Sequence, residues 1–235
     1  MTFEEIFTQL RSLGSEHTQK TYKRHGSGEN VFGVSFANYA LLKKQFVGRG
    51  KDKQRAHALA RQLWQTQNID ARSLATLIAD PQQLTEAEVM GWVADIHYHA
   101  LADLFAVLLF QAPCRQKKMN EWLSAPQEML QRIAYTLLGR LALEDRSLPE
   151  SFFEAHVQRL EPLLHAAPNR AKEAMNSALI SIGSRSEALR HAVEQAADRL
   201  GPIRIDHGDT SCQTFVIREY LERIWARKQK LTNKE

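Results

Sequence analysis

The sequence has few of the features that mark membrane, secreted or strand-rich proteins. It holds two cysteines in 235 residues, Cys114 and Cys212, and they lie far apart. Such a pair is typical of reduced thiols rather than of a disulfide framework. No run of about eighteen apolar residues without charge occurs, so no membrane span is indicated. The opening MTFEEIFTQLRSLG is acidic and amphipathic and lacks the order of a signal peptide. We expect a cytoplasmic protein.

Several patterns of known chemistry are missing as well. There is no glycine-rich phosphate loop and no Ser-His-Asp order. Only IRID, residues 203–206, hints at extended structure, and it is too short to weigh. No linker or low-complexity segment interrupts the chain, so we expect a single domain over residues 1–235. The size and the 43% hydrophobic content allow a sizeable core.

Acidic residues are scarce over one long stretch. Between Asn30 and Ile69 the sole acid is Asp52, although the net charge of the whole chain is only +4. The basic residues of that stretch are Lys43, Lys44, Arg49, Lys51, Lys53, Arg55 and Arg61. This asymmetry suggests a face for a polyanion. The alternative for any single cluster is a solvated helix face.

Helical periodicity is what the sequence does contain. Apolar residues in 129–141 and 152–164 each form one stripe with the helical period. Capping boxes are predicted at Thr85 with Glu88, Ser124 with Gln127, and Ser147 with Glu150. We predict an all-α protein with helices near 2–12, 35–47, 52–66, 71–79, 85–94, 97–110, 115–123, 127–143, 149–165, 169–182, 185–199 and 212–228. One helix pair for roughly each 35 to 45 residues is the size of a HEAT or armadillo unit, which predicts a curved solenoid of antiparallel pairs. Because no strict sequence repeat is visible, a compact helical bundle is the alternative.

One helix carries a carboxylate in an unusual place. In HYHALADLF, residues 97–105, Asp103 is the only formal charge between Asp95 and Arg115 if the histidines are neutral. An unpaired carboxylate in an apolar interior costs several kcal/mol. Asp103 must therefore have a partner or face a wet groove. It could cap a helix, pair with an arginine or belong to a site.

Several stretches together resemble the HEAT-like alkylpurine DNA glycosylases of the DNA alkylation repair family. They are TYKRHGSGENVFGVS, ALARQLWQTQNIDARSLATLIADP, WVADIHYHALAD, WLSAPQEMLQRIAYTLL, AMNSALISIG and IRIDHGDTSCQT. The resemblance covers most of the chain. It implies a helical solenoid whose concave basic face cradles double-stranded DNA, and excision of cationic N3- or N7-alkylated purines. It also implies that no metal or cofactor is needed. We expect a monomer.

The resemblance assigns roles to individual residues. Asp103 matches the catalytic aspartate, which stabilises positive charge on the sugar. Arg132 matches the arginine that grips phosphate with its planar fork. Tyr22 matches a tyrosine that lines the cleft, and an aromatic side chain packed under the first repeat is its alternative. Two positions depart from the pattern, because His99 and Ser177 stand where active members carry tryptophans. Losing two cation–π contacts of about 0.5 to 2 kcal/mol each would weaken catalysis.

The residues expected to contact DNA are therefore Tyr22, Tyr98, His99, Ser177, Lys43, Lys44, Lys51, Lys53 and Arg55, with Tyr98 as a substitute aromatic wall. The leading hypothesis is a glycosylase in which Asp103 and Arg132 are catalytic. The second is a DNA-binding protein without that chemistry, and the third is a scaffold for another protein. A metal site on Asp95, His99 and Asp103, or on Asp206, His207 and Cys212, is the weaker alternative to ordinary capping and turn contacts, with Gly208 permitting a turn.

Overall fold

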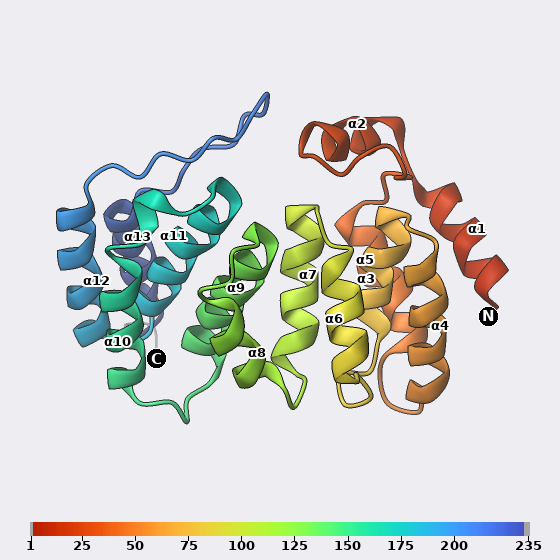
Figure 1. Ribbon diagram of the computed structural model, residues 1–235, viewed down its shortest axis with the longest axis horizontal. Coiled ribbons are helices and arrows are strands. Elements are labelled where there is room, and N and C mark those ends of the chain that lie inside the picture. Colours follow the sequence, from red (N-terminus) through yellow and green to blue (C-terminus); the bar gives the residue numbers. More distant parts are fainter. Residues whose placement is uncertain (1, 233–235) are drawn as a thin grey trace. The chain divides into compact units, whose positions relative to one another are not determined.

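Residues 2–232 are described by a computed structural model, and their regular structure is α-helical (Figure 1). This range holds thirteen α-helices and one 3-10 helix: α1 (Phe3–Leu13), α2 (Glu16–Arg24), α3 (Phe36–Phe46), α4 (Lys53–Gln65), α5 (Ile69–Ile78), α6 (Glu86–Ala94), α7 (His99–Phe110), α8 (Arg115–Trp122), α9 (Glu128–Glu144), α10 (Glu150–Leu160), η1 (Leu164–Ala166), α11 (Asn169–Gly183), α12 (Glu187–Leu200) and α13 (Ile217–Thr232). The prediction of an all-helical chain is confirmed.

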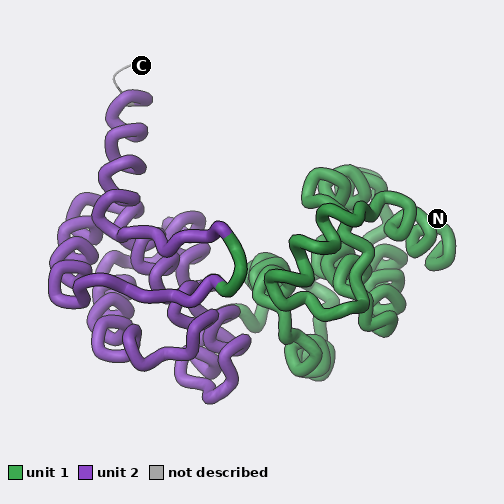
Figure 2. The backbone as a smooth tube through the Cα atoms, turned by 90° about the horizontal axis from the view of Figure 1, so that it is seen from above, with its two compact units in different colours: residues 1–116, 208–210 green, residues 117–207, 211–235 purple. Residues whose placement is uncertain are grey.

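The backbone contacts divide the chain into two compact units (Figure 2). Unit 1 comprises residues 1–116 and 208–210, and unit 2 comprises residues 117–207 and 211–235. The sequence predicts a single domain over residues 1–235, and the division into two units leaves this a prediction. Within the described range, no helix is both long enough and apolar enough to cross a bilayer.

Helix α5 forms the centre of unit 1. It packs against α3, α4 and α7, and all of its residues except Leu77 are buried. Beside it, the indoles of Trp64 and Trp92 stack with ring centroids 4.3 Å apart. A short apolar helix of this kind is stable because its neighbours cover it on every side, not because of its own periodicity.

Helix α11 has the corresponding place in unit 2, where it packs against α9, α12 and α13. Arg185 follows α11 and donates to the carbonyl oxygens of Ala142, Asp145 and Leu148 at distances of 2.8–3.0 Å. These carbonyls lie at and beyond the end of α9, so the guanidinium fixes that end against α11.

The sequence predictions were wrong at several helix boundaries. Helix α2 was not predicted, because EHTQKTYKR has no apolar stripe and none of its residues is buried. The last helix begins at Ile217 rather than 212, and no helix is assigned to residues 201–216. The capping box of Thr85 and Glu88 is confirmed. Those at Ser124 and Ser147 were wrong, because α9 and α10 begin after Gln127 and Pro149 without a side-chain cap.

Candidate nucleic-acid interface

A buried carboxylate attaches α2 to the rest of unit 1. Asp70, at the start of α5, is fully buried and accepts hydrogen bonds from the backbone N–H groups of Phe32, Gly33 and Val34 at 2.5, 3.1 and 2.8 Å. The hydroxyl of Tyr39 donates to the same carboxylate at 2.6 Å. Four donors compensate the cost of burying the charge. The loop that follows α2 is thereby held in one conformation.

Tyr22 is placed by that loop. Its hydroxyl donates to the carbonyl oxygen of Val34 at 2.8 Å. Burial, followed by the negative charge of Asp70, raises the pKa of Tyr22 to about 12. Tyr22 is therefore a neutral donor at any physiological pH, and its ring is fixed beside the start of α7.

Four aromatic side chains meet at this point, and we call Tyr22, His25, Tyr98 and His99 the ring cluster. The ring centroids of Tyr22 and Tyr98 lie 6.2 Å apart, those of Tyr98 and His99 5.0 Å, and those of His25 and His99 5.7 Å. Tyr98 is buried, whereas the two histidines are half-buried. The structure therefore brings together three of the predicted DNA contacts and adds His25.

Asp103 lies on α7 one helical turn after His99, so the two side chains share a helix face. It is half-buried, which means that its carboxylate is not sealed in the apolar core.

Asp95 does not belong to this face, because it caps the end of α6. The Asp95 carboxylate accepts from Trp64 at 3.1 Å and pairs with Arg72 at 2.8 Å. The alternative of a metal site assumed that Asp95, His99 and Asp103 share one helix face. That assumption is wrong, because Asp95 lies outside α7.

The basic residues predicted to grip DNA lie elsewhere in unit 1. Lys43 and Lys53 line a cavity of about 280 Å³ together with Val107, Leu108 and Gln111, at the C-terminal end of α7. Lys44, Lys51 and Arg55 are exposed on the neighbouring turn and helix ends. Since α7 has 12 residues, this basic surface is about 18 Å along the helix from the ring cluster. The structure does not bring these residues to the ring cluster.

In unit 2, Arg132 is held by α11. Its side chain is 7% exposed, and its Nη1 donates to the carbonyl oxygen of Arg170 at 3.0 Å and to Glu173 at 2.8 Å. Arg170 also pairs with Glu173 at 3.3 Å, and its backbone N–H donates to Glu128. One carboxylate therefore orients two guanidiniums. A grip of Arg132 on phosphate stays a proposal.

Ser177 is exposed on α11, and it lines a cavity of about 390 Å³ with residues of the irregular segment 201–216, which follows α12. His207 is part of that segment. Its Nε2 lies 3.2 Å from the hydroxyl of Thr214, and its Nδ1 lies 3.9 Å from Glu173. Gly208 has φ +60°, which confirms that it permits a turn.

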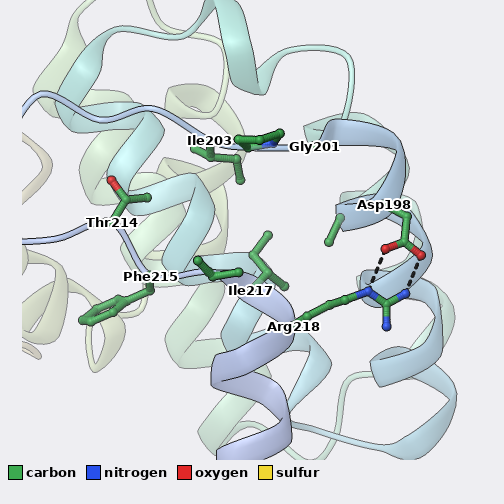
Figure 3. Close-up of a pocket in the computed structure, with 10 residues that line it drawn as sticks. Asp198, Gly201, Ile203, Thr214, Phe215, Ile217 and Arg218 are labelled. Carbon is green, nitrogen blue, oxygen red and sulfur yellow. Dashed lines mark hydrogen bonds and ion pairs between the residues drawn. The ribbon is translucent and has the colours of Figure 1, made fainter.

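A second cavity of unit 2, of about 410 Å³, is lined mainly by apolar residues, together with Thr214 and one ion pair (Figure 3). Arg218 binds Asp198 through two hydrogen bonds at its rim. Ile203, Phe215 and Ile217 are among its lining residues. Thr214 and Phe215 lie on the side away from Asp198, and both residues also line the cavity that Ser177 lines.

Sequence reasoning missed Asp70, His25 and Glu173. Asp70 and Glu173 bind partners 31 to 41 residues away, and nothing in the local pattern signals such contacts. His25 could have been found, because it directly follows a basic segment and precedes the GSG turn typical of a helix end.

The comparisons with known proteins agree with this architecture. A family model described as DNA alkylation repair enzyme matches residues 6–212, and the chain belongs to that family. Uncharacterized protein Lin0241 of Listeria innocua is 23% identical over 232 residues, which cover 95% of this chain and 97% of the relative. Uncharacterized protein Lmo0209 of Listeria monocytogenes is 22% identical with the same coverage.

A solved structure shares the fold with a TM-score of 0.86 and 24% identity, over 97% of this chain and 95% of its own. It is described as a new family of proteins related to the HEAT-like repeat DNA glycosylases with affinity for branched DNA structures. The prediction of HEAT-like helix pairs is thereby confirmed.

Proposed function

We propose that this protein binds duplex DNA and prefers branched structures. The observation that carries the proposal is the placement of two surfaces suited to DNA at opposite ends of α7. The ring cluster offers aromatic faces on which unpaired bases stack, and the lysines of residues 43–53 offer charge for phosphates. A branch point interrupts the stacking of base pairs and so exposes base faces at its centre, while its arms carry phosphates on several sides, so a junction can use both surfaces. The DNA affinity attributed to the structural neighbour supports this proposal.

The test compares a linear duplex with a three-way junction of the same length by fluorescence anisotropy. The wild-type protein should bind the junction more tightly, and His99→Ala should lose about tenfold of that affinity, because stacking on one aromatic ring contributes about 1 to 3 kcal/mol per base. His97→Ala is the matched control, because His97 is exposed two residues earlier and outside the ring cluster. Equal affinities of the wild type for both DNAs would refute the preference.

A second candidate function is hydrolysis of the N-glycosidic bond of cationic alkylpurines. It is favoured by the position of Asp103, one turn from His99 and half-buried, where a carboxylate could stabilise positive charge forming on deoxyribose. The family membership supports it as well. The measurement is release of N7-methylguanine from methylated DNA. The wild type should exceed the spontaneous rate and Asp103→Asn should not, and wild-type release at the spontaneous rate would refute this function.

A further inference from the structure

The cavity at the C-terminal end of α7 has apolar walls that remain open to solvent. Ala56, Ile78 and Leu108, from three different helices, are buried and supply part of these walls. Val47 also lines the cavity and is 42% exposed. The volume of about 280 Å³ lies just below the range of about 300 to 1,000 Å³ that is usual for small-molecule pockets. One or two apolar side chains of a partner would fill it, and covering such surface is favourable.

The same cavity carries positive charge. Lys43 and Lys53 are among its lining residues, and neither ammonium forms an ion pair in the part of the chain that the structure describes. Asp80 is the one carboxylate among the described lining residues. Its oxygens accept from the backbone N–H of Gln82 at 3.1 Å and from Nε2 of Gln83 at 2.9 Å, and Lys53 acts on it through charge alone. The two lysines are therefore available to an anionic ligand.

Positive charge continues beyond the cavity, which restricts the kind of ligand. Lys44, Arg49 and Lys51 are exposed on α3 and on the turn that follows it. The nearby acid, Asp52, caps the start of α4. A small ligand with one anionic head group would use only part of this charge, and DNA phosphates would leave the apolar walls uncovered. A polypeptide with several carboxylates beside an apolar side chain matches both features.

We propose that this surface binds an acidic segment of a partner protein. An apolar side chain of the segment enters the cavity, and neighbouring aspartates or glutamates pair with Lys43 and Lys53. The proposal goes beyond DNA binding and does not depend on it. Because the same two lysines are expected to contact phosphates, such a segment would bind in place of DNA.

The test uses a fluorescein-labelled peptide in which aspartates flank one leucine and one phenylalanine. Two control peptides replace either the two apolar residues by alanine or all of the aspartates by asparagine. Binding is measured by fluorescence anisotropy. The wild type should bind the acidic apolar peptide at least about tenfold more tightly than either control, because each control loses the apolar burial or the ion pairs.

Two variants locate the binding site. Lys43→Gln removes one charge from the cavity and should weaken binding of the acidic apolar peptide about three- to fivefold. Lys44→Gln is the matched control, because Lys44 is exposed on the same helix and does not line the cavity. It should change the affinity by less than about twofold.

The proposal is overturned if either control peptide binds as tightly as the acidic apolar peptide, or if the two variants lose the same affinity. Tighter binding of decanoate, which carries one anion on an apolar chain, would assign the cavity to a small amphiphile and overturn the proposal as well. Binding of DNA junctions is measured separately, so none of these results refutes the proposed function.

Discussion

At the scale of single residues, two carboxylates bind and position groups that lie far from them in the sequence. Asp70 holds the loop 32–34 through three backbone N–H groups, and Glu173 holds two arginines. Removing one partner of such a buried arrangement is expensive, because it leaves a charge or a row of donors uncompensated. The positions of Tyr22 and Arg132 therefore depend on Asp70 and Glu173, which are not among the predicted DNA contacts.

A third carboxylate, Glu88, gives a pH-dependent prediction. Burial pushes the pKa of Glu88 upward, but hydrogen bonds from Arg61 and Thr85 outweigh burial and lower that pKa from 4.5 to about 2. Because the folded-state pKa is below the ordinary value, the stabilisation is complete above pH 4.5 and is lost as the pH falls towards 2. Glu88→Gln should lower the free energy of unfolding by about 2 to 3 kcal/mol at pH 7.

The measurement is chemical denaturation at several values of pH between 7 and 3. The difference between wild type and Glu88→Gln should shrink steadily below pH 4.5. A difference that stays constant across this range would contradict the role given to the ionised carboxylate.

At the scale of elements, hydrogen bonds rather than buried side chains hold α2 against the rest of unit 1. None of its residues is buried, and its position depends on Ser15 at its start and on the loop 31–34 after it. Gly33 makes this attachment possible. It has φ +81°, and a Cβ atom there would lie 2.4 Å from the backbone nitrogen of Gln19 in α2.

Gly33→Ala should therefore displace α2 and separate Tyr22 and His25 from α7. We expect a loss of DNA affinity of at least about tenfold, since the ring cluster is dispersed, with the helical circular-dichroism signal nearly unchanged. Gly26→Ala is the matched control, because Gly26 has φ +86° but nothing within 4 Å of the added atom. It pays the same backbone strain of about 1 kcal/mol without the clash. Similar affinities of the two variants would show that α2 is not displaced.

The helices of the solenoid could be predicted from the sequence, but α2 and the candidate site could not be assembled from it. Amphipathic stretches such as those of α9 and α10 carry a period that any single sequence reveals. The attachment of α2 depends on Asp70, whose partners are 31 to 38 residues away. The lysines of residues 43–53 were expected to contact DNA because the charge of a segment can be counted in a sequence. The sequence does not reveal that they lie at the C-terminal end of α7, far from Tyr22.

At the scale of the whole molecule, DNA binding should be strongly salt-dependent if the lysine surface contacts phosphates. Each phosphate contact adds about 0.9 to the slope of log affinity against log salt concentration. Replacing Lys51 and Lys53 together by Gln should reduce that slope by about 1 to 2 for the three-way junction. Arg199→Gln is the control, since Arg199 is already bound to Glu161 through two hydrogen bonds. An unchanged slope in the double variant would remove these lysines from the interface.

The last helix, α13, packs against the end of α11. Leu221 of α13 is fully buried and lies against Gly183, while Trp225 and Lys228 donate to the carbonyl oxygens of Gly183 and Ser184 at the end of α11. Helix α13 therefore covers an apolar surface at the end of α11 that would otherwise be exposed. A variant that ends before residue 217 would expose the apolar surface that Leu221 covers, and it should aggregate. An additional helical repeat could pack against this end of α11 only if α13 were displaced.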